Sequence, residues 1–242
     1  MENKENTPEK YILYGASFNP PHMGHFSAIS QMLDTHDKII IFPYPQKFAE
    51  GKIEELPPIS QRIKMLQLFI HEFFPNKKIH EKKIMVVNLA AEIQKQQKEE
   101  LTEVLFKNLT GQSNDSVEKK VLHTYDYLKF VKNRMPEGFT LSACLGFEAQ
   151  NISRKEEFFN EEKIKEEFPH FFLEEETTIK SQDLRDFFSS HKNIKSKKDE
   201  QYIKACVGNS LAEFIFENNL YGVKKKTAQS KTETLTTRPK LR

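Results

Sequence analysis

The chain has 242 residues, of which 37% are hydrophobic and 20 are phenylalanine, enough for one medium α/β domain with a packed core. No apolar run is long enough to cross a bilayer and there is no signal peptide, which excludes an integral membrane protein and favours the cytoplasm. The net charge of +2 is unevenly distributed, because Val223–Arg242 holds seven Lys or Arg and one Glu, leaving 30 basic against 34 acidic residues elsewhere. With a mildly acidic body, nucleic acid is not an expected partner. The two cysteines, Cys144 and Cys206, fit no disulfide or metal spacing, as is usual in a reducing compartment.

The first ninety residues predict alternating strands and helices. Short apolar runs bounded by Gly or Pro are typical of buried strands, and apolar residues at intervals of three and four are typical of helices. Ser60 is a candidate N-cap, because it directly precedes such a helical pattern. In chain order we expect a strand at Tyr11–Tyr14, a helix at Met23–Leu33, a strand at Lys38–Phe42, a helix at Gln61–Phe74 and a strand at Ile84–Val87.

The second half begins with a segment of different texture. Residues 90–120 are rich in Glu, Gln and Lys, and Leu101–Leu109 carries an apolar stripe, which predicts a helical insertion and a candidate surface for a homo-oligomer. Residues 223–242 have almost no apolar side chains and predict a disordered basic tail, so the folded domain is expected at residues 10–222 after a flexible start at 1–9. The elements expected after the insertion are a helix at Thr124–Arg134, strands at Thr140–Leu145 and Phe171–Leu173, and helices at Gln182–Phe188 and Glu200–Asn218.

Strands that alternate with helices predict a Rossmann-like α/β fold, a parallel sheet with helices on both faces. Ligands of such sheets bind at the carboxyl ends of the strands, near the point where the strand order reverses. The unusual residues of this chain fall there. They are Gly15–His25 after the first strand, Pro45–Phe48 after the second and Gly146–Glu148 after the fourth.

Gly15–His25, which we call the signature loop, reads GASFNPPHMGH. Its glycines allow close backbone approach, and its prolines stiffen the turn between them. His22 and His25 lie three residues apart at the start of the next predicted helix, so they share one helical turn. A helix N-terminus with two imidazoles can donate hydrogen bonds to phosphate oxygens and stabilise charge that develops during phosphoryl transfer. A pair of histidines alone is more often structural, so the specificity comes from the whole string.

The string resembles the signature G-x-x-F-x-P-x-H-x-G-H of the HxGH nucleotidyltransferase superfamily, and matches it at Gly15, Phe18, Pro20, His22, Gly24 and His25. The resemblance implies that His22 and His25 are catalytic and bind the phosphates of ATP without a covalent intermediate. It also implies Mg²⁺ as the companion of ATP. ATP-binding residues implied within the loop are Gly15, Ser17, Phe18 and Gly24.

A second phosphate element is predicted near the C-terminus. Ser181 can cap the helix that follows and Arg185 lies one turn into it, which together favour an anion site. The segment resembles the superfamily's I-S-S-T-x-[IV]-R element, although Lys180 and Gln182 replace a serine and the threonine. In the same family a G-x-D segment after the fourth strand binds the ribose, which implies that Gly146 and Glu148 also bind ATP.

Within the superfamily the chain most resembles nicotinate or nicotinamide mononucleotide adenylyltransferase, an enzyme of NAD biosynthesis. The resemblance extends in order through Gln61–Ile70, the segment beginning at Thr124, and the ending Asn219–Tyr221. It implies ATP and a mononucleotide acceptor as substrates, with Lys47, Phe48 and Thr124 as acceptor-binding residues. Two alternatives remain open. One is an enzyme similar to phosphopantetheine adenylyltransferase, a family that usually has Thr where this chain has His22, and the other is a nucleotide-binding protein with little catalysis that docks a partner.

Overall fold

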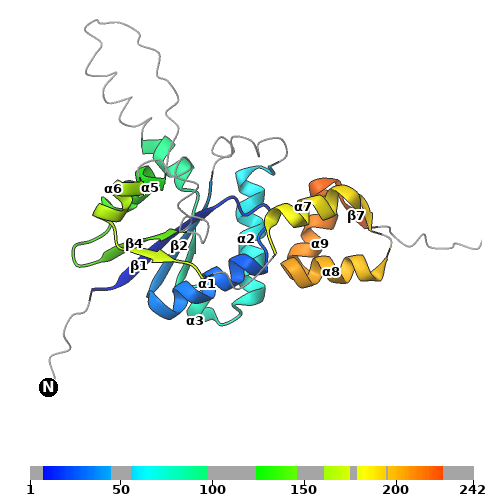
Figure 1. Ribbon diagram of the computed structural model, residues 1–242, viewed down its shortest axis with the longest axis horizontal. Coiled ribbons are helices and arrows are strands. Elements are labelled where there is room, and N and C mark those ends of the chain that lie inside the picture. Colours follow the sequence, from blue (N-terminus) through cyan, green and yellow to red (C-terminus); the bar gives the residue numbers. More distant parts are fainter. Residues whose placement is uncertain are drawn as a thin grey trace, which may run out of the picture.

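The computed structural model describes residues 8–44, 56–96, 124–145, 161–174, 179–194 and 196–225. Five parallel strands form one sheet in the order β3-β2-β1-β4-β5, and helices cover both of its faces (Figure 1). This arrangement confirms the predicted Rossmann-like α/β fold. The strands are β1 (Lys10–Ala16), β2 (Lys38–Pro43), β3 (Ile84–Val86), β4 (Thr140–Leu145) and β5 (His170–Phe172), each within a few residues of its predicted position.

The central strands divide the interior into two cores, because successive side chains of a strand point to opposite faces. Ile12 and Tyr14 of β1 belong to the larger core, whereas Leu13 between them belongs to the smaller one. The larger core is built with α1 (Met23–Thr35), α2 (Ile59–Phe73), α7 (Ser181–Ser190), α8 (Lys197–Val207) and α9 (Asn209–Glu217). The smaller core is built with residues 89–96, α5 (Thr124–Lys132) and α6 (Glu161–Glu167), and a short helix α3 (Lys77–His80) precedes β3.

The prediction that Ser60 caps α2 is wrong. The N-cap is Pro58, whose carbonyl accepts hydrogen bonds from the backbone N–H groups of Gln61 and Arg62 at 2.9 and 3.1 Å. The helix therefore begins at Ile59, and Ser60 already lies in its first turn. Pro58 makes no side-chain cap hydrogen bond, so the helix starts without a capping side chain.

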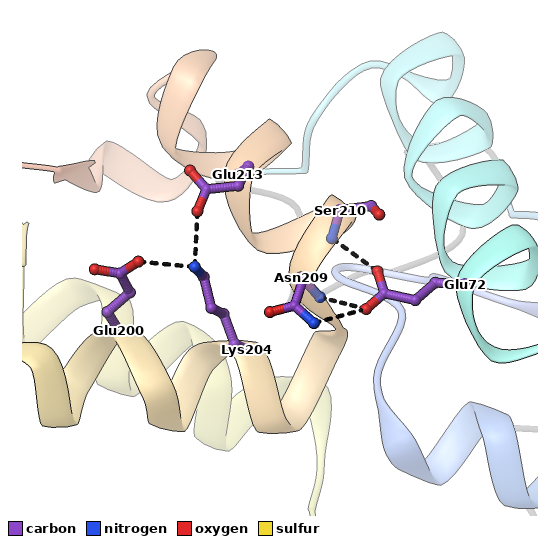
Figure 2. A network of polar contacts seen from close by, with 6 residues as sticks. All are labelled: Glu72, Glu200, Lys204, Asn209, Ser210 and Glu213. Carbon is purple, nitrogen blue, oxygen red and sulfur yellow. Dashed lines mark hydrogen bonds and ion pairs between the residues drawn. The ribbon is translucent and has the colours of Figure 1, made fainter.

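The single long helix predicted at Glu200–Asn218 is also wrong, because Gly208 divides it into α8 and α9. Gly208 has a φ of 89°, and a Cβ there would approach the Cδ of Glu72 and a ring carbon of Phe73 to 2.9 Å. Glu72 of α2 accepts the first free N–H groups of α9, those of Asn209 and Ser210, at 2.6 and 2.7 Å (Figure 2). A carboxylate at this position stabilises the positive end of a helix, so α2 determines where α9 starts.

An ion-pair network joins α8 to α9. Lys204 of α8 lies 2.8 Å from carboxylate oxygens of both Glu200, on the same helix, and Glu213 of α9 (Figure 2). Partly buried charges in a network contribute more than an isolated surface pair. The network and the Glu72 cap together attach the C-terminal helices to each other and to α2.

The folded part continues beyond the boundary predicted at residue 222. Val223 is fully buried, and β7 (Lys224–Lys225) pairs with β6 (Asn193–Ile194) in a small second sheet after the single turn η5 (Leu220–Gly222). The rest of the predicted tail, and the predicted insertion beyond residue 96, lie outside the described residues. Within the described ranges, no helix is both long enough and apolar enough to cross a membrane.

Candidate active site

The signature loop leaves β1 at the carboxyl edge of the sheet and enters α1. The strand order runs outward in one direction from β1 to β2 and in the other from β1 to β4, so the loop begins at the point where the order reverses. A crevice outside the carboxyl ends of the strands at this point is the usual ligand site of such folds. The first turn of α1 contains no acidic residue, so no side chain of that turn neutralises the positive end of the helix.

Backbone N–H groups at the start of α1 hold the rings of His22 and His25 in place. His22 is the N-cap, and its Nδ1 accepts the backbone N–H of Gly24 at 3.0 Å. The backbone N–H of His22 in turn donates to Nδ1 of His25 at 3.2 Å. The two rings lie 4.0 Å apart between centroids, and both side chains are buried. Each imidazole is thus fixed by the helix start itself.

These contacts determine which ring nitrogen carries the proton. A neutral imidazole that accepts at Nδ1 must carry its hydrogen at Nε2. Burial lowers the pKa of His22 to about 4, and burial together with the neighbouring His22 lowers the pKa of His25 well below its ordinary value. Both rings are therefore neutral near pH 7, and Nε2–H of each has no hydrogen-bond partner among the described residues. The site presents two fixed, uncharged donors beside a helix N-terminus.

The C-terminal part of the chain holds the middle of the loop. Arg185 Nη1 donates to the carbonyl of Asn19 at 2.8 Å, and the Ser181 hydroxyl donates to the carbonyl of Pro20 at 3.3 Å. The Tyr221 hydroxyl donates to Oδ1 of Asn19 at 2.7 Å, and the ring of Tyr221 stacks on Phe188. Three side chains from α7 and η5 thus fix two consecutive loop residues, bonded through a cis peptide, against the sheet.

The structure brings the second phosphate element to the histidines, with one correction. Arg185 holds the carbonyl of Asn19, three residues before His22, and its positive charge adds to the burial that lowers the pKa of His22. Lys180, not Ser181, is the N-cap of α7, and Asp183 accepts the Lys180 backbone N–H at 2.9 Å. The prediction that Ser181 caps this helix is wrong, because its hydroxyl is engaged with the loop. Gln182, which replaces the family's threonine, accepts a hydrogen bond from Arg185 Nη2 and orients the guanidinium.

The other predicted loop residues contribute through packing and backbone. A Cβ on Gly15 would come within 2.6 to 2.8 Å of ring atoms of Phe42 and Tyr44, so the glycine allows the aromatic end of β2 to pack against β1. Phe18 is fully buried, and its ring centroid lies 4.8 Å from that of His25, so its side chain packs against the histidine. The predicted contact of Phe18 with ATP could therefore be made only by its backbone. Gly24 donates to His22, and the Ser17 carbonyl accepts from Arg62.

A family model described as cytidylyltransferase-like matches residues 13–195, more than half of the chain. The chain belongs to the cytidylyltransferase-like family. This confirms the predicted nucleotidyltransferase with an HxGH loop, and the protein is an enzyme of that class.

Comparison with curated proteins finds no match. Among solved structures, the chain is similar to a Vibrio parahaemolyticus protein assigned as a nicotinate-nucleotide adenylyltransferase, with a TM-score of 0.57 at 17% identity over 88% of this chain and 96% of that one. It is also similar to nicotinic acid mononucleotide adenylyltransferase from Plasmodium falciparum. The structure of that enzyme with NaAD gives a TM-score of 0.55 at 18% identity, and the structure with APC gives 0.53 at 19%, each over 88% of this chain and 97% of that one. At these identities the likeness shows the fold.

Thr124, predicted to bind the acceptor, lies beside the end of β2 in this cytidylyltransferase-like domain. The Thr124 hydroxyl lies 3.2 Å from the hydroxyl of Tyr44, and the Tyr44 backbone N–H donates to the carbonyl of Ala16 at the end of β1. Thr124 therefore starts α5 at the same carboxyl edge as the signature loop. Four predicted site residues lie outside the described residues: Lys47, Phe48, Gly146 and Glu148.

Three further residues lie at the site although they were not among the predicted site residues. Tyr221 and Asn19 are joined by the hydrogen bond described above across 202 positions of sequence. Arg62 lies beneath the signature loop and is fully buried. Its sequence signal is visible in retrospect, because Arg62 shares the apolar stripe of α2 with Met65, Leu66, Phe69 and Ile70, the other buried residues of that helix.

Proposed function

We propose that this nucleotidyltransferase transfers AMP from ATP to nicotinate or nicotinamide mononucleotide and releases pyrophosphate, a step of NAD biosynthesis in the cytoplasm. The observation that carries the proposal is the pair of neutral imidazoles at the N-terminus of α1, each anchored through Nδ1 and each with a donor at Nε2. Beside them lies the guanidinium of Arg185. Donors fixed in this way suit a polyphosphate whose charge shifts during the reaction.

In the proposed reaction, a phosphate oxygen of the acceptor attacks the α-phosphorus of ATP in line. A P–O bond forms to the acceptor while the bond from the α-phosphorus to the bridging oxygen breaks, and the electron pair leaves with pyrophosphate. Nε2–H of His22 and His25 donates to the phosphate oxygens on which charge develops, and no proton needs to be transferred from either ring. Catalysis of this kind is positioning and electrostatic stabilisation.

Mg²⁺ fits this site as a companion of ATP. Nε2–H donors and a guanidinium bind phosphate oxygens, whereas a cation needs acceptor atoms. Among the described residues, no group of three or more His, Cys, Asp or Glu side chains is placed to hold a metal. The residues that would hold the Mg²⁺–ATP complex are those that hold its phosphates, His22, His25 and Arg185, and the ion would neutralise part of the phosphate charge.

The choice of acceptor is supported by three features. The fold is similar to that of the Plasmodium enzyme solved with NaAD. The hydroxyl groups of Thr124 and Tyr44 are in contact at the carboxyl edge of the sheet. Tyr44 lies shortly before the predicted acceptor residues Lys47 and Phe48 in the chain. The histidine at the first position of the HxGH string also favours this family over the phosphopantetheine enzymes.

The acceptor is tested by incubating the protein with ATP, Mg²⁺ and one candidate at a time, and measuring pyrophosphate release. We expect release with nicotinate or nicotinamide mononucleotide. Release with phosphopantetheine alone would move the assignment to the sister family. Binding of ATP without release from any acceptor would favour the partner-docking alternative.

The role of the histidines is tested with a substitution that keeps the helix start intact. Asparagine is a good N-cap, so His22→Asn retains a side-chain acceptor for the N–H of Gly24 but removes the Nε2 donor. We expect turnover to fall about a hundredfold or more, as when a preorganised donor is lost elsewhere, with little change in melting temperature. Wild-type turnover in a folded His22→Asn protein would contradict the proposed mechanism.

A further inference from the structure

Arg62 is a fully buried cation directly beneath the site. It is among the largest side chains with essentially no exposed surface, and burial lowers the pKa of its guanidinium. No carboxylate forms an ion pair with Arg62 within the described ranges, and burial raises the pKa of the nearby Tyr221 phenol, which therefore stays neutral. A buried charge without a counter-ion is costly, and an apolar side chain of similar volume is often at least as stable. Packing alone therefore does not account for an arginine here.

The guanidinium joins three segments that are separate in sequence. Nη1 donates to the carbonyl of Ser17 in the signature loop at 2.9 Å and to the carbonyl of Tyr44 at the end of β2 at 2.8 Å. Nε donates to the carbonyl of Pro57, just before α2, at 3.0 Å. Tyr44 is the last described residue before the predicted acceptor residues Lys47 and Phe48. One side chain thus connects the signature loop to Tyr44, directly after β2.

One nitrogen of the Arg62 guanidinium donates to none of these carbonyls. Nη2 is buried and has no hydrogen-bond partner among the described residues. An unsatisfied buried donor on a charged group is rare in folded proteins and needs an explanation. The three neutral carbonyls do not cancel the positive charge, so the field of Arg62 acts on whatever anion occupies the site above it.

We propose that Arg62 is a positioning residue of the nucleotide site, which fixes the signature loop and the chain after β2 through the carbonyls of Ser17 and Tyr44, and whose unneutralised charge favours anionic substrates. The part that concerns the acceptor rests on the proposed function. The part that concerns ATP does not, because it depends only on the signature loop and not on which acceptor is used.

The test compares two substitutions of Arg62 with two controls. Arg62→Lys keeps the positive charge, but a lysine lacks the planar guanidinium that donates to three carbonyls at once. Arg62→Met removes both the charge and the hydrogen-bond donors. Lys64→Met removes an exposed charge from the same helix. Glu72→Gln weakens the attachment of α9 to α2 without changing a group that Arg62 contacts. For each variant, folding is checked by circular dichroism and melting, and ATP affinity is measured by calorimetry.

We expect ATP to bind about tenfold more weakly to Arg62→Lys and more weakly still to Arg62→Met, because the loop carbonyls lose charge-assisted hydrogen bonds. Both controls should bind ATP within about twofold of the wild-type protein. Wild-type affinity in a folded Arg62→Lys protein would overturn the proposal. So would an equal loss in Glu72→Gln, because the effect would then follow from general destabilisation.

Turnover separates positioning from a structural role. If Arg62 positions both the signature loop and the chain after β2, KM for ATP and KM for the acceptor rise together in Arg62→Lys. A loss of folded protein alone would lower kcat and leave both KM values unchanged, which would contradict the proposal. If the wild-type protein releases no pyrophosphate with any acceptor, the proposed function fails, and the calorimetric comparison still decides the role of Arg62 toward ATP.

Discussion

The hydroxyl of Tyr221 offers a direct test of how the C-terminal segment supports the active site. Tyr221→Phe removes one oxygen and keeps the ring, which stacks on Phe188 at 5.0 Å between centroids. The lost hydrogen bond is 2.7 Å long and leaves Oδ1 of Asn19 without this donor. Asn19 is 1% exposed, so water replaces the donor poorly. An unsatisfied buried acceptor costs about 1–3 kcal/mol.

In a protein of this size, a loss of about 2 kcal/mol lowers the melting temperature by roughly 4–8 °C. Turnover should also fall, by roughly tenfold or more, because Asn19 lies in the loop that carries His22 and small displacements of catalytic groups are costly. The assay is a pair of measurements, thermal melting and pyrophosphate release, on the same preparation.

Tyr202→Phe is the matched control, because Tyr202 lies on α8 with 41% of its surface exposed. Its stability should stay within about 0.5 kcal/mol of the wild-type protein, with wild-type turnover. If Tyr221→Phe melts and turns over like Tyr202→Phe, the hydroxyl does not hold the loop and the inferred support from η5 is refuted.

Two further predictions concern stability. Glu72→Gln removes the charge that accepts two backbone N–H groups at the start of α9, and should cost about 1 kcal/mol in urea unfolding; unchanged stability would show that Gly208 alone sets the break. The pKa of His22 is lowered by burial from 6.5 to about 4 in the folded protein, so the unfolded chain binds more protons between these values and stability falls as pH drops through this window. Between pH 7 and pH 5 this group should cost about 2 kcal/mol, and His22→Asn should lose that part of the pH dependence; an equally steep dependence in the variant would contradict the assignment.

How far the sequence could predict the site depended on the distance of the contacts along the chain. The signature loop could be recognised because its two histidines and two glycines lie within eleven residues, and the structure shows each histidine ring held by the backbone of a residue within this loop. The prediction that Ser181 caps α7 was wrong because the hydroxyl instead donates to the carbonyl of Pro20, which lies 161 positions away in the sequence. A serine before a helical pattern looks like a cap in either case.

The same distinction applies to the fold. Apolar runs and their spacing in the sequence determined the five parallel strands and most helices, because burial on both faces of a parallel sheet requires continuous apolar segments. The division of the last helix could not be predicted, since it depends on Glu72 accepting the N–H groups of Asn209 and Ser210 from 137 and 138 positions away.

By itself, the sequence determined the class of the enzyme and the signature loop by which that class is recognised, because both depend on residues that are neighbours in the chain. Only the tertiary structure decided how the loop is held. Arg62, Arg185 and Tyr221 all donate to groups within residues 17–19. These three donors come from different helices, and hydrogen bonds between distant segments leave no periodic trace in a sequence. Folding therefore places around the signature loop the support on which its two histidines depend.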